Sequence, residues 1–370
     1  MRPDIIIISA FIVGSGIIAL ELGITTAIAE LIAGVIAHQL GLTFENEGVI
    51  EVLADIGILT LMYVAGLEID LDMLRKSFKP SLAIGSASFI FPFISIILIS
   101  TYLLPFIMDQ PFTIKQILLI AIALSTTSIA IVYPILRQSG APDKERKMIL
   151  SAAMITDLLS MLALGILFLE QSTLLIALAL IMGLFLFTFM FPFFGGRVFG
   201  HYKGNVAEFE FKIILLLLLV VAIASEEAGI ESAIIAFILG MITSEVVVKH
   251  EDLETKLRGI VFGFFAPIFF FSVGFSMVAK DFIDNILLLL IFFITCFTMK
   301  YAGTYLASRR YVPDSAGYVA TLFNSRLSLG IIAAVLGLES GVFNQGVYSA
   351  IIGAVVLSSI LSSFMCRKRP

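Results

Sequence analysis

The sequence has few charged residues and few of the side chains from which catalytic and metal sites are built. Only 14% of its 370 residues are Asp, Glu, Lys or Arg, whereas soluble domains carry about 25%. Its two cysteines give no disulfide framework. Its three histidines do not cluster with cysteine at ligand spacing, so we expect no transition-metal site. HExxH and P-loop motifs are also absent, and we therefore expect no enzyme activity, no cofactor and no nucleic-acid partner.

Apolar residues dominate the chain instead. They make up 59% of the sequence, and the mean hydropathy is +1.08. Several runs of about 20 residues are nearly continuous, which is the length that spans hydrocarbon as a helix. These runs do not alternate with period two, as the strands of a membrane barrel do. The sequence therefore predicts an all-α polytopic membrane protein, with its lipid bilayer as a partner and no soluble domain.

We predict thirteen membrane helices. Their approximate ranges are 4–20, 24–41, 50–67, 80–105, 113–137, 147–169, 172–195, 210–226, 230–248, 259–279, 284–308, 315–337 and 345–365. Basic residues gather in the loops after every second helix from the third onward and at the C-terminus, whereas the opposite side holds Arg2, Lys115 and Lys280. The positive-inside rule then places the N-terminus outside and the C-terminus in the cytoplasm. An odd number of helices suits two six-helix halves of opposite orientation, joined by the seventh helix.

Asp157 is a carboxylate deep within the sixth predicted helix. An ionised side chain at that depth costs roughly 3 kcal/mol by insertion measures, so water, a cation or a counter-charge must reach it. Ser160 lies three residues on and shares its helix face, and Thr156 is adjacent. Asp157 is therefore a candidate to bind a cation or a proton, and a structural ion pair with Lys300 is the alternative.

Four hydroxyl residues, Ser125, Thr126, Thr127 and Ser128, interrupt the fifth predicted helix. Such side chains compete with the helix for backbone groups. One interpretation is a broken helix whose freed carbonyls form a midplane cation site. The other is a continuous helix whose hydroxyls bond back to carbonyls or to neighbouring helices.

Two basic residues fall within predicted membrane helices. Arg326 follows Asn324 in an interruption of the twelfth helix, and a structural role in capping carbonyls or pairing with an acid is favoured for it. Lys300, in the eleventh helix, is too far from the helix end to reach the interface easily. It can serve as a counter-ion, a titrating amine or a structural tether, and the residues alone do not separate these roles.

Four stretches of the sequence resemble the monovalent cation:proton antiporter superfamily, in the branch of bacterial sodium/proton exchangers and potassium-efflux proteins. They are residues 22–34, residues 53–70, the run Ala-Leu-Ser-Thr-Thr-Ser-Ile-Ala at 123–130, and the run Ala-Pro-Ile-Phe-Phe-Phe-Ser-Val-Gly at 266–274. The resemblance implies crossed, broken helices in a core bundle at about 80–169 and 284–365. A dimerisation bundle is implied at about 4–67 and 172–279. Asp157 then binds the cation or the proton, with Thr126, Thr127 and nearby backbone lining the site.

One position departs from the family pattern. Charge-moving members carry two consecutive aspartates on this helix, with a lysine similar to Lys300 beside the first, whereas here the first position is Thr156. A single titrating carboxylate suggests that one proton is exchanged for one cation. We therefore expect an electroneutral antiporter by alternating access, acting on Na⁺ first and K⁺ second, as a homodimer in a prokaryotic inner membrane. A channel-like K⁺ module lacking its cytoplasmic regulatory domain and a sodium-coupled solute symporter are the alternatives.

Overall fold

The structure is a computed structural model that describes residues 3–22, 24–42, 47–69, 77–106, 111–138, 141–168, 209–227, 231–247 and 251–366. Every regular element in these ranges is helical. The elements are α1 (Pro3–Leu22), α2 (Thr26–Gln39), α3 (Glu47–Leu67), α5 (Phe78–Tyr102), η1 (Leu104–Phe106), α6 (Ile114–Ala123), α7 (Ile129–Gln138), α8 (Asp143–Phe168), α10 (Phe209–Glu227), α11 (Ser232–Val247), α12 (Glu251–Ile260), η3 (Val261–Phe265), α13 (Ala266–Phe275), α14 (Ala279–Asp284), α15 (Ile286–Tyr311), η4 (Pro313–Ser315), α16 (Ala316–Leu322), α17 (Ser328–Glu339) and α18 (Gln345–Cys366). The predicted all-helical fold is confirmed, while the predicted helix at 172–195 lies outside the described residues.

Six of the described helical segments are long and apolar enough to cross a membrane. They are Gly48–Leu67, Phe78–Phe106, Asp143–Phe168, Leu253–Phe275, Ile286–Tyr311 and Gln345–Cys366. Shorter apolar helices, of 10–17 residues, include both Ile114–Ala123 and Ser328–Glu339. These short helices mark the two places where a predicted span is interrupted.

Several predicted boundaries were wrong at charged helix ends. The tenth predicted helix, 259–279, in fact starts at Glu251 and continues through a π-helical turn, η3, into α13. Glu254 and Arg258 pair at i and i+4, at 2.9 Å, which supports helix beyond the apolar run. Similarly, α8 starts at Asp143, because acidic residues in a first turn favour the helix dipole.

The chain forms two compact units. Unit 1 consists of Met1–Leu22, Thr26–Asp70 and Phe168–Ser276, and unit 2 consists of Gly23–Thr25, Leu71–Leu167 and Met277–Pro370. The predicted core and dimerisation bundles have similar bounds, although the roles assigned to them stay predictions.

Within unit 1, glycines let helices approach to backbone contact. A Cβ added to Gly34 of α2 would lie 2.1 Å from the carbonyl oxygen of Phe271 on α13, and Gly274 faces α2 in the same way. Gly66 of α3 and Gly240 of α11 form a second such pair. Helices in lipid gain no hydrophobic free energy by associating, so the close van der Waals packing at these small residues stabilises the contacts.

An ion pair joins two segments of unit 1. Glu68, directly after α3, accepts a hydrogen bond from the Arg258 guanidinium at 2.7 Å. Burial raises the pKa of Glu68, and the Arg258 charge opposes this rise without cancelling it. The pair ties α3 to α12, outside the apolar part of α3.

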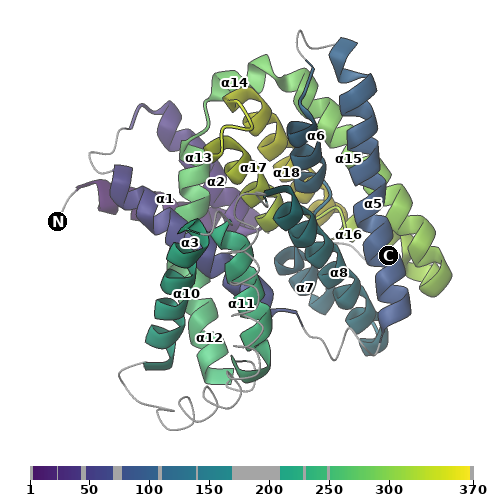
Figure 1. Cartoon of the computed structure of the whole chain (residues 1–370), viewed down its shortest axis with the longest axis horizontal. Helices are drawn as coiled ribbons and strands as arrows, with labels where there is room; N and C mark the ends of the chain where they lie inside the picture. The colour runs from purple at the N-terminus through teal and green to yellow at the C-terminus, as the bar shows by residue number, and fades with distance from the viewer. Residues whose placement is uncertain are drawn as a thin grey trace. The chain divides into compact units, whose positions relative to one another are not determined.

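Unit 2 holds every residue that the sequence singled out as a candidate for ion binding. Its α5 and α15 run side by side (Figure 1), and α15 also contacts α16 and α18. The short α6 packs against α17, so the two interrupted spans lie together within this unit. Unit 2 is therefore where the candidate site is built.

Candidate functional site

The fifth predicted span is broken at residues 124–128, which we call break 1. Helix α6 ends at Ala123 and α7 begins at Ile129. The hydroxyls do bond back into the last turn of α6, since Ser125 Oγ donates to Ala121 O at 2.6 Å and Thr126 Oγ1 to Ala123 O at 3.3 Å. These bonds end the helix instead of continuing it, so the continuous-helix interpretation is wrong.

The twelfth predicted span is broken in the same way at residues 323–327, which we call break 2. Helix α16 ends at Leu322, and α17 begins at Ser328 after Leu327, whose backbone is neither helical nor extended (φ −148°, ψ −79°). The two breaks touch, because the Ser128 amide donates to Ser325 O at 2.7 Å and Thr127 Oγ1 donates to Phe323 O at 3.3 Å. The structure therefore brings Thr127 and Ser128 of break 1 against break 2, while Ser125 and Thr126 bond back to α6.

Arg326 lies inside this junction and is fully buried. Its guanidinium donates to Leu124 O in break 1, to Cys296 O on α15 at 3.3 Å, and to Asn324 Oδ1 at 2.8 Å. A full positive charge thus lies at the C-terminal end of α6, where helix carbonyls lack partners and the helix dipole is negative.

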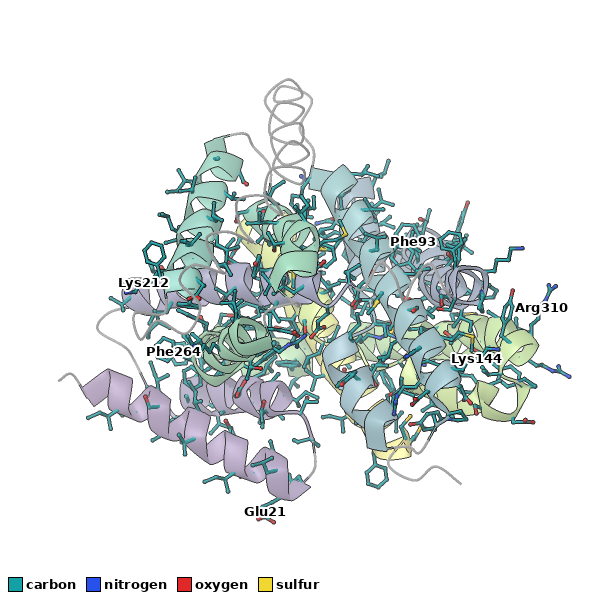
Figure 2. All side chains as sticks on the ribbon, turned by 90° about the horizontal axis from the view of Figure 1, so that it is seen from below. Glu21, Phe93, Lys144, Lys212, Phe264 and Arg310 are labelled. Atoms are coloured by element: carbon teal, nitrogen blue, oxygen red, sulfur yellow. The ribbon has the colours of Figure 1, made fainter. Side chains whose placement is uncertain are left out.

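Lys300 is a second buried cation at the same helix end. Its Nζ donates to Ser125 O at 2.6 Å and to Ser88 O of α5 at 3.1 Å, and the side chain has no solvent exposure. By contrast, Arg310 near the end of the same helix α15 points away from the ribbons (Figure 2) and is exposed. The Asp157 charge acts on Lys300 electrostatically.

Asp157 lies on α8 and is 6% exposed. The preceding Thr156 donates to Gly85 O of α5 and to Ala152 O, both at 3.2 Å. Gly85 leaves no room for a side chain, because a Cβ there would lie 2.5 Å from Ala152 O. Ser160 Oγ donates to Thr156 O at 2.8 Å. The Thr156 contact therefore fixes α8 against α5 at the level of Asp157.

The backbone oxygens of break 1 fall into two groups. Leu124 O and Ser125 O accept from Arg326 and Lys300, and Ser128 O accepts from the first amides of α7. In the part of the chain that the structure describes, no donor reaches the carbonyl oxygens of Thr126 and Thr127. These residues are each 1% exposed. Two buried carbonyls without a donor are oxygen ligands available to a cation.

Sequence reasoning missed several groups that shape this site. Three serines of α18, Ser358, Ser359 and Ser362, bond to break 2. Backbone oxygens of Ser88 and Cys296 hold the two cations. The serines share one side of a predicted helix, which was the available signal. A backbone acceptor, however, has no sequence signature.

A helical membrane protein with two interrupted spans in contact, and buried charges at the contact, has the architecture of a secondary transporter. The fold matches the sodium proton antiporter MjNhaP1 from Methanocaldococcus jannaschii with a TM-score of 0.69, at 14% identity, over 97% of this chain and 94% of that chain.

Sequence comparison gives the family. The model of the transmembrane sodium/hydrogen exchanger family matches residues 7–367, and the chain belongs to that family. Over 98% of its length it is 27% identical to 96% of a Na⁺/H⁺ antiporter of Enterococcus hirae. It is also 29% identical to a probable Na⁺/H⁺ antiporter of M. jannaschii, over 91% of this chain and 88% of that one. The Na⁺/H⁺-K⁺ antiporter GerN of Bacillus cereus is 25% identical over 95% of this chain and 92% of its own length. The predicted superfamily is confirmed, and the family is one of transporters.

Proposed function

We propose that the chain exchanges Na⁺ for H⁺ at a site formed by Asp157 and the free carbonyls of break 1. The observation that carries this proposal is one buried carboxylate in the same unit as two backbone oxygens of buried residues that no donor among the described residues reaches. Carboxylate and carbonyl oxygens are the ligands that hard cations prefer. The hydroxyls of Ser125, Thr126, Thr127, Ser128, Thr156 and Ser160 complete the polar surroundings. K⁺ is the second candidate ion, because the relative GerN is described as handling both.

Because the cation and the proton compete for one carboxylate, their movements across the membrane are coupled. A proton and a cation each neutralise Asp157, and neither binds while the other is present. An empty, ionised carboxylate is unfavourable in a buried site, so the loaded forms are the ones that move across the membrane. Because Thr156 stands beside Asp157, a single titrating group exchanges one proton for one monovalent cation, and the cycle is electroneutral.

Lys300 and Arg326, with Asn324, serve as structural charges in this proposal. Each cation binds a carbonyl at the C-terminal end of α6, which compensates the helix dipole and the unsatisfied acceptors there. Asn324 holds the Arg326 guanidinium through its side-chain oxygen. Neither cation needs to lose its proton during transport.

Alternating access follows if unit 2 carries the site and moves against unit 1. Unit 2 corresponds to the expected core bundle and unit 1 to the expected dimerisation bundle. The two breaks support an inverted repeat, because each lies in the fifth helix of its predicted half. We propose a homodimer in a prokaryotic inner membrane, with the N-terminus outside and the C-terminus cytoplasmic.

Exchange in proteoliposomes tests the proposal. A pH-sensitive dye inside the vesicles should report proton movement on addition of Na⁺, at a rate that does not change when the membrane potential is clamped. The apparent KM for Na⁺ should rise as pH falls, because protons compete for Asp157. Separate additions of K⁺ and Li⁺ give the order in which the three ions drive proton movement.

Asp157→Asn should reduce this exchange by about 100-fold or more, because a neutral amide cannot hold a cation in a buried site. Asp143→Asn is the matched control: it makes the same change on the same helix at an exposed position, about 21 Å along the axis. Exchange by Asp157→Asn at the rate of the control would reject the assignment of the carboxylate.

A further inference from the structure

Helix α18 carries three serines directed at break 2 and at the adjoining end of α16. Ser358, Ser359 and Ser362 have no solvent exposure. Each of them donates to a carbonyl outside its own helix. This distinguishes them from Ser160, Ser225 and Ser340, whose hydroxyls donate to the carbonyl four residues earlier.

Ser358 and Ser359 bind backbone groups of break 2, whereas Ser362 binds the end of α16 and the Ser325 side chain. Ser358 Oγ donates to Asn324 O at 2.8 Å. Ser359 Oγ donates to Arg326 O and accepts from the Arg326 amide, so it holds both backbone groups of that residue. Ser362 Oγ donates to Thr321 O at 2.6 Å and also bonds Ser325 Oγ.

These bonds leave break 2 without a free carbonyl. The acceptors and their donors are Phe323 with Thr127 Oγ1, Asn324 with Ser358 Oγ, Ser325 with the Ser128 amide, Arg326 with Ser359 Oγ, and Leu327 with the Ile331 amide. In break 1, by comparison, no donor from the described residues reaches the carbonyls of Thr126 and Thr127. Of two breaks that touch, one can offer backbone oxygens to a cation and the other cannot.

We propose that Ser358, Ser359 and Ser362 are positioning residues that confine cation binding to break 1 and thereby set ion selectivity. The inference rests on the proposed function and extends it to residues that do not touch the cation. By holding Arg326, Ser359 also places the guanidinium that binds Leu124 O. Loss of these hydroxyls frees Asn324 O or Arg326 O as additional ligands and loosens the contact between the breaks. Extra carbonyl ligands favour the larger ion.

The test compares Ser358→Ala and Ser359→Ala with Ser349→Ala. Ser349 lies on the same helix and is equally buried, and its hydroxyl has no hydrogen-bond partner among the described residues. All three variants remove one hydroxyl from α18. We expect the first two to raise the apparent KM for Na⁺ by about threefold to tenfold, the range that one lost hydrogen bond produces. The KM for K⁺ should rise less, so that selectivity narrows, while kcat stays within about twofold. Ser349→Ala should leave all of these values at wild type.

The results distinguish a failure of the positioning role from a failure of the proposed function. If Ser358→Ala and Ser359→Ala fold and match Ser349→Ala in KM and in the Na⁺/K⁺ ratio, the positioning role is wrong while the proposed function stands. If wild type shows no Na⁺-driven proton movement, the proposed function itself fails. Should Ser359→Ala not fold, Ser358→Ala, which removes a single bond, carries the test. Ser358→Thr keeps the hydroxyl and should restore the Na⁺/K⁺ ratio; failure to restore it counts against the proposal.

Discussion

Break 1 and break 2 have the same length and touch each other, yet their backbone oxygens have different partners. The first carbonyls of break 1 bind the charged side chains of Arg326 and Lys300, and the next two stay open. All the carbonyls of break 2 are bound by neutral hydroxyl or amide donors. A broken membrane helix is therefore not a cation site by virtue of being broken. The donors that surrounding helices supply decide which oxygens remain for an ion.

The comparison also separates two ways of stabilising a helix end in an apolar environment. Positive side chains at the C-terminal end of α6 compensate the negative end of its dipole. They also place two buried positive charges near the site where we expect the transported cation to bind. Hydroxyls at break 2 satisfy acceptors without adding charge. Combining the two keeps the junction rigid and limits the positive charge that an arriving cation meets.

Replacing Arg326 should give the largest effect, because this side chain joins the breaks. Arg326→Gln leaves the acceptors Leu124 O and Cys296 O without their charged donor in a fully buried place. We expect stability to fall by about 3 kcal/mol or more, since each bond to a charged group contributes roughly 1.5–3 kcal/mol, and exchange to be lost.

Arg326→Lys is the control for this change. It keeps the charge but not the planar fork of donors, so its stability should lie between those of wild type and Arg326→Gln. Thermal unfolding in detergent and proton movement in vesicles measure both variants. Equal melting temperatures for the Gln and Lys variants would mean that the guanidinium does not hold the breaks together.

Lys300 offers a sharper contrast, because its loss should preserve exchange. Lys300→Met removes a buried charge close to the site and opens Ser125 O to the cation. Loss of the like charge favours cation binding, so the apparent KM for Na⁺ should fall by about tenfold at moderate effective dielectric.

The turnover number of Lys300→Met should fall as well, because a more tightly held ion leaves more slowly. Initial rates over a range of Na⁺ concentrations give both constants, and Lys280→Met, on the short helix α14, is the control. Complete loss of exchange in Lys300→Met alone would show that the amine takes part in proton transfer and is not only a cap.

Particular residues show how much of the fold and of the candidate site the sequence predicts. Apolar runs predicted the six described segments that are long and apolar enough to cross a membrane, because about 20 apolar residues is the helix length that spans hydrocarbon. The polar interruptions at Ser125–Ser128 and Asn324–Arg326 located both breaks, since four hydroxyls or a buried arginine need partners that a continuous helix does not give.

The sequence could not predict which residues supply the hydrogen-bond partners of the two breaks. Ser358 and Ser359 are ordinary for a membrane helix, and only the crossing of α18 with break 2 gives them a role. Likewise, nothing marks Ser88 or Cys296 as the residue whose backbone oxygen receives a charged side chain. Pairings of this kind depend on helix packing over long sequence separations, which composition and periodicity do not encode.

The smallest expected effect comes from the two threonines of break 1, which form a matched pair. Thr126 and Thr127 are equally buried, and each Oγ1 donates to a carbonyl at 3.3 Å. Thr126 bonds within its own segment, whereas Thr127 bonds across to Phe323 O. Thr127→Val should therefore lower stability more than Thr126→Val, by about 1 kcal/mol for the bond between breaks.

Both variants keep their carbonyls, so both should continue to exchange Na⁺ for protons, with KM raised by no more than about tenfold if each hydroxyl contributes a single ligand. Melting curves in detergent, paired with Na⁺ titrations of proton movement, compare them directly. If Thr126→Val is the less stable of the two, the contact between the breaks is not what holds break 1 in place. Its backbone shape would then depend on the local turn at the end of α6.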